Sequence, residues 1–231
     1  MKMKIKWYGQ ACFLIESSSG LKIVTDPYTP ETAGYKYVSE MADLVITSSD
    51  NDSFHCRADL ISGNPAIMNA LAVAQAGSDG VGARTERGIE VHAIEAMEAL
   101  NHRFHDPDQN GMYKFTIDGI SIGHMGDVGN AMSEKQTEFF KGIDVMLVLA
   151  GGHPTIELDD LKRFLDDIQP KLIIPMHFRT LSYKPRNIYW IQNFLDYYDD
   201  KLVDFACSCE ATLTKEQLPA STRVLVIDNV S

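Results

Sequence analysis

The sequence predicts an α/β protein in which two β-sheets are covered by helices within one domain. Strand-like runs separated by short polar or glycine breaks open the chain, as in an antiparallel meander. The second half alternates helical and strand-like segments, as in β-α-β units. No low-complexity tract or short-period repeat separates the two halves, so residues 1–231 are taken as a single domain.

The composition argues against nucleic acid or a membrane as the partner. A net charge of −11 disfavours binding to a phosphate backbone, which needs clustered Lys and Arg. No apolar stretch approaches the ~18 residues of a membrane span, and we expect no signal peptide. Four cysteines in such a chain predict free thiols and a cytoplasmic location.

The first third of the chain is predicted to hold four short strands. The opening three are separated by Gly9-Gln10 and by 17–20, and the fourth is apolar and runs into the polar segment 48–53. Asp26-Pro27 ends the third strand, because proline cannot donate to a ladder. These strands are expected at 4–8, 11–16, 21–25 and 44–47.

The middle of the chain gives mixed signals. Residues 64–76 are Ala-rich and are interpreted as a helix or a strand followed by a helix. Four glycines without periodicity at 77–88 predict a mobile loop that could act as a lid, and 101–111 is a second irregular loop. Asp118-Gly119 is a strong hairpin turn. The strands of this region are expected at 89–94, 114–117 and 120–124.

The second half is predicted to alternate helices and strands. Ser133 and Gln136 form a capping box at the start of one helix. Thr155 can cap a second helix, which has one apolar stripe and stops at Pro170. Apolar residues at helical spacing over 188–198 indicate a third helix. Strands are expected at 144–149, 172–174, 202–205 and 224–227.

Three acidic or histidine side chains near strand ends are candidate functional residues. Asp127 lies between glycines beyond a strand, and His177 follows a central apolar strand. His105 lies in the irregular loop. Taken singly, they are also consistent with a turn-forming aspartate, a core histidine and a solvated loop residue.

Four motifs in order resemble the metallo-β-lactamase-fold hydrolases. GHMGDVG (123–129), IDVMLVLAGGHPT (143–155) and KLIIPMHFRT (171–180) are similar to the second half of that fold. The opening IKWYGQACFLIESSSGLKIVTDPY (5–28) resembles the first hairpins of the branch that contains L-ascorbate-6-phosphate lactonase and Zn-dependent hydrolases. The resemblance implies a four-layer αββα sandwich with the active cleft at one edge.

The same resemblance implies metal ligands. His105 resembles a ligand of the first metal, Asp127 the aspartate that bridges two metals, and His177 the last ligand of the second metal. The segment after the fourth strand departs from the usual His-x-His-x-Asp-His. We favour the alignment in which Asp52 occupies the position of the motif's aspartate and Ser48, Asp50 and Ser53 occupy the positions of its histidines. An alignment shifted by one residue leaves no good ligand at these positions.

In the favoured alignment, the two metal positions would keep three ligands each. One has Asp50, His105 and Asp127, and the other has Asp52, Asp127 and His177. Three protein ligands plus water is typical of catalytic zinc, whereas the oxygen-rich set favours Mn or ferrous iron, so we expect a divalent Zn, Mn or Fe ion.

His55 and Cys56 lie just downstream of the altered segment and are possible substitutes for the missing histidine ligands.

The predicted activity is hydrolysis of a small molecule by a metal-activated water, with Asp127 and Asp52 as catalytic groups. A lactone, cyclic amide or phosphoester would fit, and a homo-oligomer is implied by the resemblance alone. Because histidines are lost, a metal-poor, non-catalytic binding protein on the same fold is the alternative.

Weaker signals have a structural and a functional interpretation. Arg179, Lys184 and Arg186 either line the cleft for an anionic substrate or lie in a solvated loop. Cys207-x-Cys209 is expected on one face of a strand, as small core residues or as a metal or redox pair.

Overall fold

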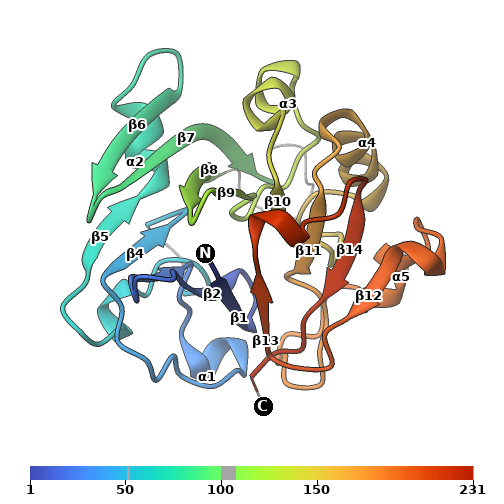
Figure 1. The fold of residues 1–231 in the computed structure, drawn as a ribbon, viewed down its shortest axis with the longest axis horizontal. Helices are drawn as coiled ribbons and strands as arrows, with labels where there is room; N and C mark the ends of the chain where they lie inside the picture. Colours follow the sequence, from blue (N-terminus) through green and yellow to red (C-terminus); the bar gives the residue numbers. More distant parts are fainter. Residues whose placement is uncertain (51–52, 100–107, 231) are drawn as a thin grey trace.

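Two β-sheets pack face to face in the computed structural model, which describes residues 1–50, 53–99 and 108–230 (Figure 1). The six-stranded sheet has the order β13-β1-β2-β3-β4-β5, and the eight-stranded sheet has the order β12-β14-β11-β10-β9-β8-β7-β6. The predicted α/β class with two sheets is confirmed.

The six-stranded sheet begins with the predicted meander. Strands β1, β2 and β3 pair antiparallel, and β4 and β5 continue the sheet in parallel with β3. Strand β13 was not predicted; it pairs with β1, so that Met3 lies opposite Leu213. The strands are β1 Met3–Gly9, β2 Cys12–Glu16, β3 Lys22–Thr25, β4 Leu44–Thr47, β5 Ala66–Asn69 and β13 Glu210–Leu213.

The eight-stranded sheet is half antiparallel and half parallel. Strands β6 to β9 pair antiparallel in chain order, and β9, β10, β11, β14 and β12 run parallel. The carboxyl ends of β9 and β11 therefore lie at the same edge. The strands are β6 Val81–Glu86, β7 Ile89–Glu98, β8 Asp108–Ile117, β9 Ile120–His124, β10 Val145–Leu149, β11 Leu172–Met176, β12 Val203–Phe205 and β14 Arg223–Val226.

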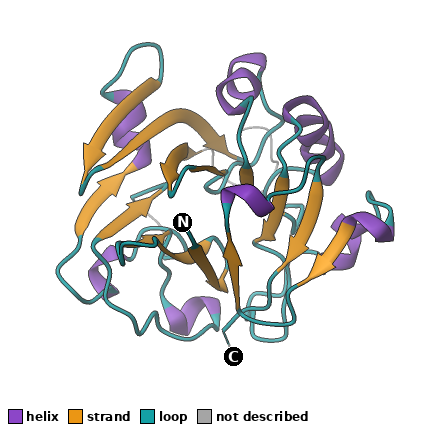
Figure 2. Cartoon of the chain, in the orientation of Figure 1, coloured by secondary structure: helices purple, strands orange, loops and turns teal. Residues whose placement is uncertain are grey.

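The helices are short, and most lie at the periphery of the strands (Figure 2). Helices α3 and α4 lie together, with the rings of Phe140 and Phe164 edge to face at 5.9 Å. Within the described ranges, no helix has the length and apolar character needed to cross a bilayer. The helices are α1 Pro30–Ala33, α2 Ala70–Gln75, α3 Glu134–Phe140, α4 Leu158–Ile168 and α5 Ile191–Leu195, with 3-10 turns η1 Ala58–Leu60, η2 Asp200–Leu202 and η3 Lys215–Gln217.

Side-chain alternation along β2 explains the layered packing. Phe13 and Ile15 enter the large core between the sheets, while Cys12 and Leu14 join a second cluster on the opposite face. Successive strand residues point to opposite faces, so one strand serves both layers. The second cluster is closed by aromatic residues from loops, among them Tyr35.

The prediction of a mobile loop or lid at 77–88 is wrong. This segment forms β6 and its turns, paired with β7. Two of the glycines serve close packing, because a Cβ at Gly82 would collide with the Val73 carbonyl of α2, and one at Gly77 with the Val81 carbonyl. The predicted strand–helix interpretation of 64–76 is confirmed by β5 and α2.

Three further predictions need correction. Thr155 does not cap α4: its hydroxyl donates to the Gly152 carbonyl, and Glu157 occupies the cap position. The helix expected over 188–198 is only α5, since Trp190 is already extended. Cys207 and Cys209 lie in the bend between β12 and β13 rather than on a strand, and Cys207 has a positive φ of 50°.

Candidate metal centre

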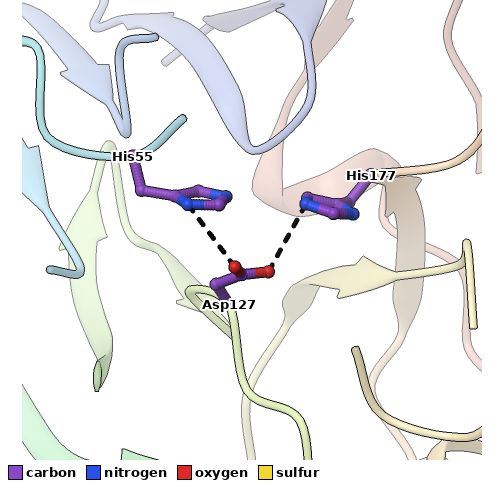
Figure 3. A group of neighbouring side chains, drawn as sticks. All are labelled: His55, Asp127 and His177. Carbon is purple, nitrogen blue, oxygen red and sulfur yellow. Dashed lines mark ion pairs between the residues drawn. The ribbon is translucent and has the colours of Figure 1, made fainter. Parts of the chain in front are cut away.

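Three side chains from distant parts of the chain converge at one site (Figure 3). His177 follows β11 directly, and Asp127 lies three residues beyond β9. His55 lies on the segment after β4 of the other sheet. The site therefore joins the carboxyl ends of strands from both sheets.

Asp127 lies between the two imidazoles. Its Oδ2 is 3.5 Å from His55 Nδ1, and its Oδ1 is 3.4 Å from His177 Nε2. The two rings are almost parallel, with an interplanar angle of 14° and centroids 5.5 Å apart. Potential ligand atoms of all three residues lie within 4.8 Å of one another, so one ion could contact them together.

The backbone around Asp127 and His177 is held in unusual conformations. His177 has a φ of 53°, and its N–H donates to the Gln10 carbonyl at 3.0 Å. Gly126, with a φ of 61°, packs so closely against Asn110 and Ser48 that a Cβ would collide with both. A glycine beside Asp127 therefore permits the close approach of these protein atoms.

The position of His55 is fixed by bonds on either side of it. The Thr29 N–H donates to the Ser53 carbonyl at 2.7 Å, and the Arg57 N–H donates to the Pro27 carbonyl at 2.8 Å. His55 is 1% exposed, so its imidazole lies inside the protein rather than on the loop surface.

A second polar cluster lies beside the triad. Asp26 accepts hydrogen bonds from the Ser48 N–H at 2.6 Å and the Ser48 hydroxyl at 2.9 Å. His124 Nε2 donates to the Ala11 carbonyl, and its Nδ1 accepts from the Gly126 N–H, both at 3.0 Å. Burial lowers the pKa of His124 to about 3, so the ring is neutral.

The predicted ligands have three different outcomes. Asp127 and His177 are brought together as expected, with His55 as the third member. Asp52 and His105 lie outside the described residues. Asp50 is exposed and is not part of the described triad, so its ligand role stays a prediction.

His55 was the harder residue to find from sequence. The usual motif places the histidine at position 53, where this chain has Ser53. The signal that could have identified it is its position two residues downstream, within reach of the same strand end. Ser48 is directed to Asp26, which explains why position 48 supplies no ligand to the triad.

The weaker cationic candidates are engaged elsewhere. The Arg179 guanidinium stacks over the Trp190 ring at 4.7 Å, and Lys184 Nζ donates to the Glu31 carbonyl at 2.6 Å. These contacts agree with the structural interpretation of the loop after β11.

The donor set fits a transition metal. Two imidazole nitrogens and one carboxylate oxygen match a three-ligand catalytic site, which keeps one position for water. The described set has more nitrogen donors than the predicted set of Asp52, Asp127 and His177, and imidazole suits Zn and Fe. Residues on opposite sheets supply the three groups, so the completed fold is required to assemble them.

Comparisons with known proteins agree with this fold. Residues 4–177 match the model of the beta-lactamase superfamily domain. A UPF0173 protein of Pyrococcus furiosus is 30% identical over 191 residues, which cover 78% of this chain and 85% of the relative. A UPF0173 metal-dependent hydrolase of Thermococcus kodakarensis is 27% identical, covering 77% and 85%.

Solved structures give the same result. A Thermotoga maritima protein described as a candidate Zn-dependent hydrolase of the metallo-β-lactamase superfamily is 30% identical, with a TM-score of 0.73 and coverage of 99% of this chain and 100% of that one. A candidate metal-dependent hydrolase from Parabacteroides distasonis is 14% identical, with a TM-score of 0.65 and coverage of 96% and 92%, and shows the fold alone. Neither description names a lactonase, so that finer resemblance stays a prediction.

Proposed function

The chain belongs to the metallo-β-lactamase superfamily and to its UPF0173 family, and from this premise we propose that it is a metal-dependent hydrolase with a single-metal centre. The ligands are His55, Asp127 and His177. The observation that carries the proposal is the convergence of these three side chains, from three separate segments, on a largely buried point.

The proposal of one ion rather than two rests on the altered segment after β4. Position 48 carries a serine whose hydroxyl is bonded to Asp26, and position 50 carries an exposed aspartate. Both positions correspond to histidines in the first metal site of the family by resemblance. The second site keeps Asp127 and His177 and gains His55.

The residues have distinct roles in the proposed reaction. When bound, a divalent metal supplies Lewis acidity and lowers the pKa of a coordinated water to about 7. The stacked imidazoles of His55 and His177 orient the ligand atoms. Asp127 is the only carboxylate of the described triad, and it accepts the proton of the attacking water.

The proposed substrate is a small molecule with a lactone, cyclic amide or phosphoester group. Attack of water on a carbonyl carbon or a phosphorus gives an oxyanion in each case, so one site serves all three classes. The net charge of −11 supports a small-molecule substrate rather than nucleic acid.

A substrate screen with metal-loaded protein tests this proposal. Protein loaded with Zn, Mn or Fe(II) should hydrolyse at least one lactone or phosphoester, and Asp127→Ala should lower the rate by at least about 1000-fold. Asp79→Ala is a matched control, because Asp79 is an exposed carboxylate of a distant turn. Equal turnover by wild type and Asp127→Ala would contradict the proposal.

A further inference from the structure

We infer that Gln10 is a further catalytic residue, whose side-chain amide donates a hydrogen bond to an oxyanion held at the triad. The inference rests on the proposed function and adds a residue to the same site. Gln10 lies at the turn between β1 and β2, far from the triad in sequence, and sequence analysis treated it only as part of a strand break.

The turn holds Gln10 rigidly beside His177. The Gln10 carbonyl accepts from Trp7 Nε1 at 2.9 Å and from the His177 N–H at 3.0 Å. Gln10 has a φ of 49°, a conformation that non-glycine residues rarely adopt. Such backbone strain persists only where the surrounding structure imposes it, and it is concentrated at functional sites.

The Gln10 amide is directed at a ligand atom. Its Nε2 lies 3.3 Å from His177 Nε2, the same nitrogen that is 3.4 Å from Asp127 Oδ1. A metal that takes the lone pair of this nitrogen removes an acceptor for the Gln10 amide. The N–H groups of Gln10 would then be available to an oxyanion beside the triad.

Burial makes this amide unusual as a purely structural group. Gln10 is 1% exposed, and its Oε1 is buried without a hydrogen-bond partner in the described part of the chain. A buried amide with an unsatisfied oxygen calls for an explanation such as a ligand or an ordered water. A bound water or substrate hydroxyl could donate to Oε1 while Nε2 donates to the oxyanion.

Phosphate binding to the zinc-loaded full-length protein tests the inference. Inorganic phosphate serves as the oxyanion probe, measured by titration calorimetry with wild type, Gln10→Ala and Gln10→Met. Met has a similar volume but no amide, so it keeps the packing. Gln75→Ala is the control, because Gln75 is an exposed residue of α2 bonded only to Gln109 in the described chain.

The inference predicts that phosphate affinity falls about 10- to 100-fold in both Gln10 variants, as expected for one hydrogen bond to a charged group. Zinc affinity should fall far less than phosphate affinity, because Gln10 is not a ligand of the metal and its amide contacts the ligating nitrogen of His177, a contact that is lost when a metal binds there. A crystal structure of the wild type with zinc and phosphate should show Gln10 Nε2 within about 3.2 Å of a phosphate oxygen.

Several results would overturn the inference. One is equal phosphate affinity in wild type and both variants. Another is the absence of phosphate binding to all three proteins. Zinc affinity reduced as much as phosphate affinity would make Gln10 a positioning residue for His177. If both variants fail to fold, the wild-type crystal structure is the test. A Gln10 amide that is turned away from the phosphate there contradicts the inference. A wild type that takes up no zinc would instead overturn the proposed function as well.

Discussion

Two clusters of the same residue types lie side by side in this protein, and only one is suited to hold a metal. The closed cluster consists of Asp26, Ser48 and His124, and all three are 0% exposed. The second is the triad, in which the carboxylate of Asp127 lies between two imidazoles and remains partly exposed.

The difference lies in how the donor atoms are used. Both ring nitrogens of His124 are bonded to backbone groups, and both oxygens of Asp26 accept from Ser48. A metal in that cluster would have to displace several buried hydrogen bonds, which is costly. In the triad, the carboxylate contacts are 3.4 and 3.5 Å, longer than good hydrogen bonds. Residue type therefore does not identify a metal site unless the local bonding is known.

The largest expected effect is the difference in zinc affinity between a variant of the triad and a variant of the closed cluster. Asp127→Asn should weaken zinc binding by more than about 100-fold, because even outer-shell partners of a metal contribute 10- to 100-fold. Asp26→Asn should weaken zinc binding far less, because the hydrogen bonds of Asp26 go to Ser48, which is not a member of the triad. Competition with a chromophoric chelator measures both constants, and equal losses in the two variants would remove the distinction.

The pH dependence of stability should come from the closed cluster. The pKa of His124 is about 3 in the folded protein and about 6.5 when unfolded, so the unfolded state binds the proton first as pH falls. Stability is full above pH 6.5 and is lost progressively towards pH 3. Between pH 7.5 and 5, the loss from this group is about 2 kcal/mol.

Urea unfolding at both pH values checks this prediction. His124→Asn should show a pH loss smaller by about 2 kcal/mol, because the variant lacks the group and keeps every other histidine. His92→Asn serves as the control, since His92 lies on β7 and its side chain is 44% exposed. The same pH loss in His124→Asn and wild type would refute the assignment.

A smaller effect is expected from Ser48. Ser48→Ala removes the hydroxyl bond to the buried Asp26 carboxylate but keeps the N–H bond, which should cost about 1–2 kcal/mol of unfolding free energy. Metal content should be unchanged. A loss of metal without a loss of stability would place Ser48 in the metal centre instead.

The smallest effect should come from Asp50. Its side chain is exposed and lies outside the described triad, so Asp50→Ala should change zinc affinity by less than about 2-fold. A decrease of 10-fold or more would restore the sequence-based assignment of Asp50 as a ligand.

Local patterns predicted much of the fold. The meander, the hairpin at Asp118-Gly119 and the capping box of α3 depend on residues close in sequence, and all three are present. Strand β13 was missed because its pairing with β1 joins segments about 200 residues apart in sequence, and EATL has weak strand character of its own. The segment 77–88 was predicted wrongly because the role of Gly82 depends on its contact with the backbone of α2, which the local sequence does not reveal.

Some residues of the candidate site could likewise be predicted from local sequence, and others could not. Asp127 and His177 were predicted because each lies just beyond the end of a strand, and strand ends determine where such side chains lie. His55 stayed an open alternative, since the path of the chain after β4 decides which residue reaches the site. Gln10 gave no signal, because its position depends on contact with a segment more than 160 residues away.

The most direct test of the single-metal centre is metal content by mass spectrometry, on wild type and His55→Ala purified without chelator. The account predicts about one ion per wild-type chain and almost none in His55→Ala, because that variant keeps only two described ligands. Full metal content in His55→Ala would contradict the account, as would two ions per wild-type chain.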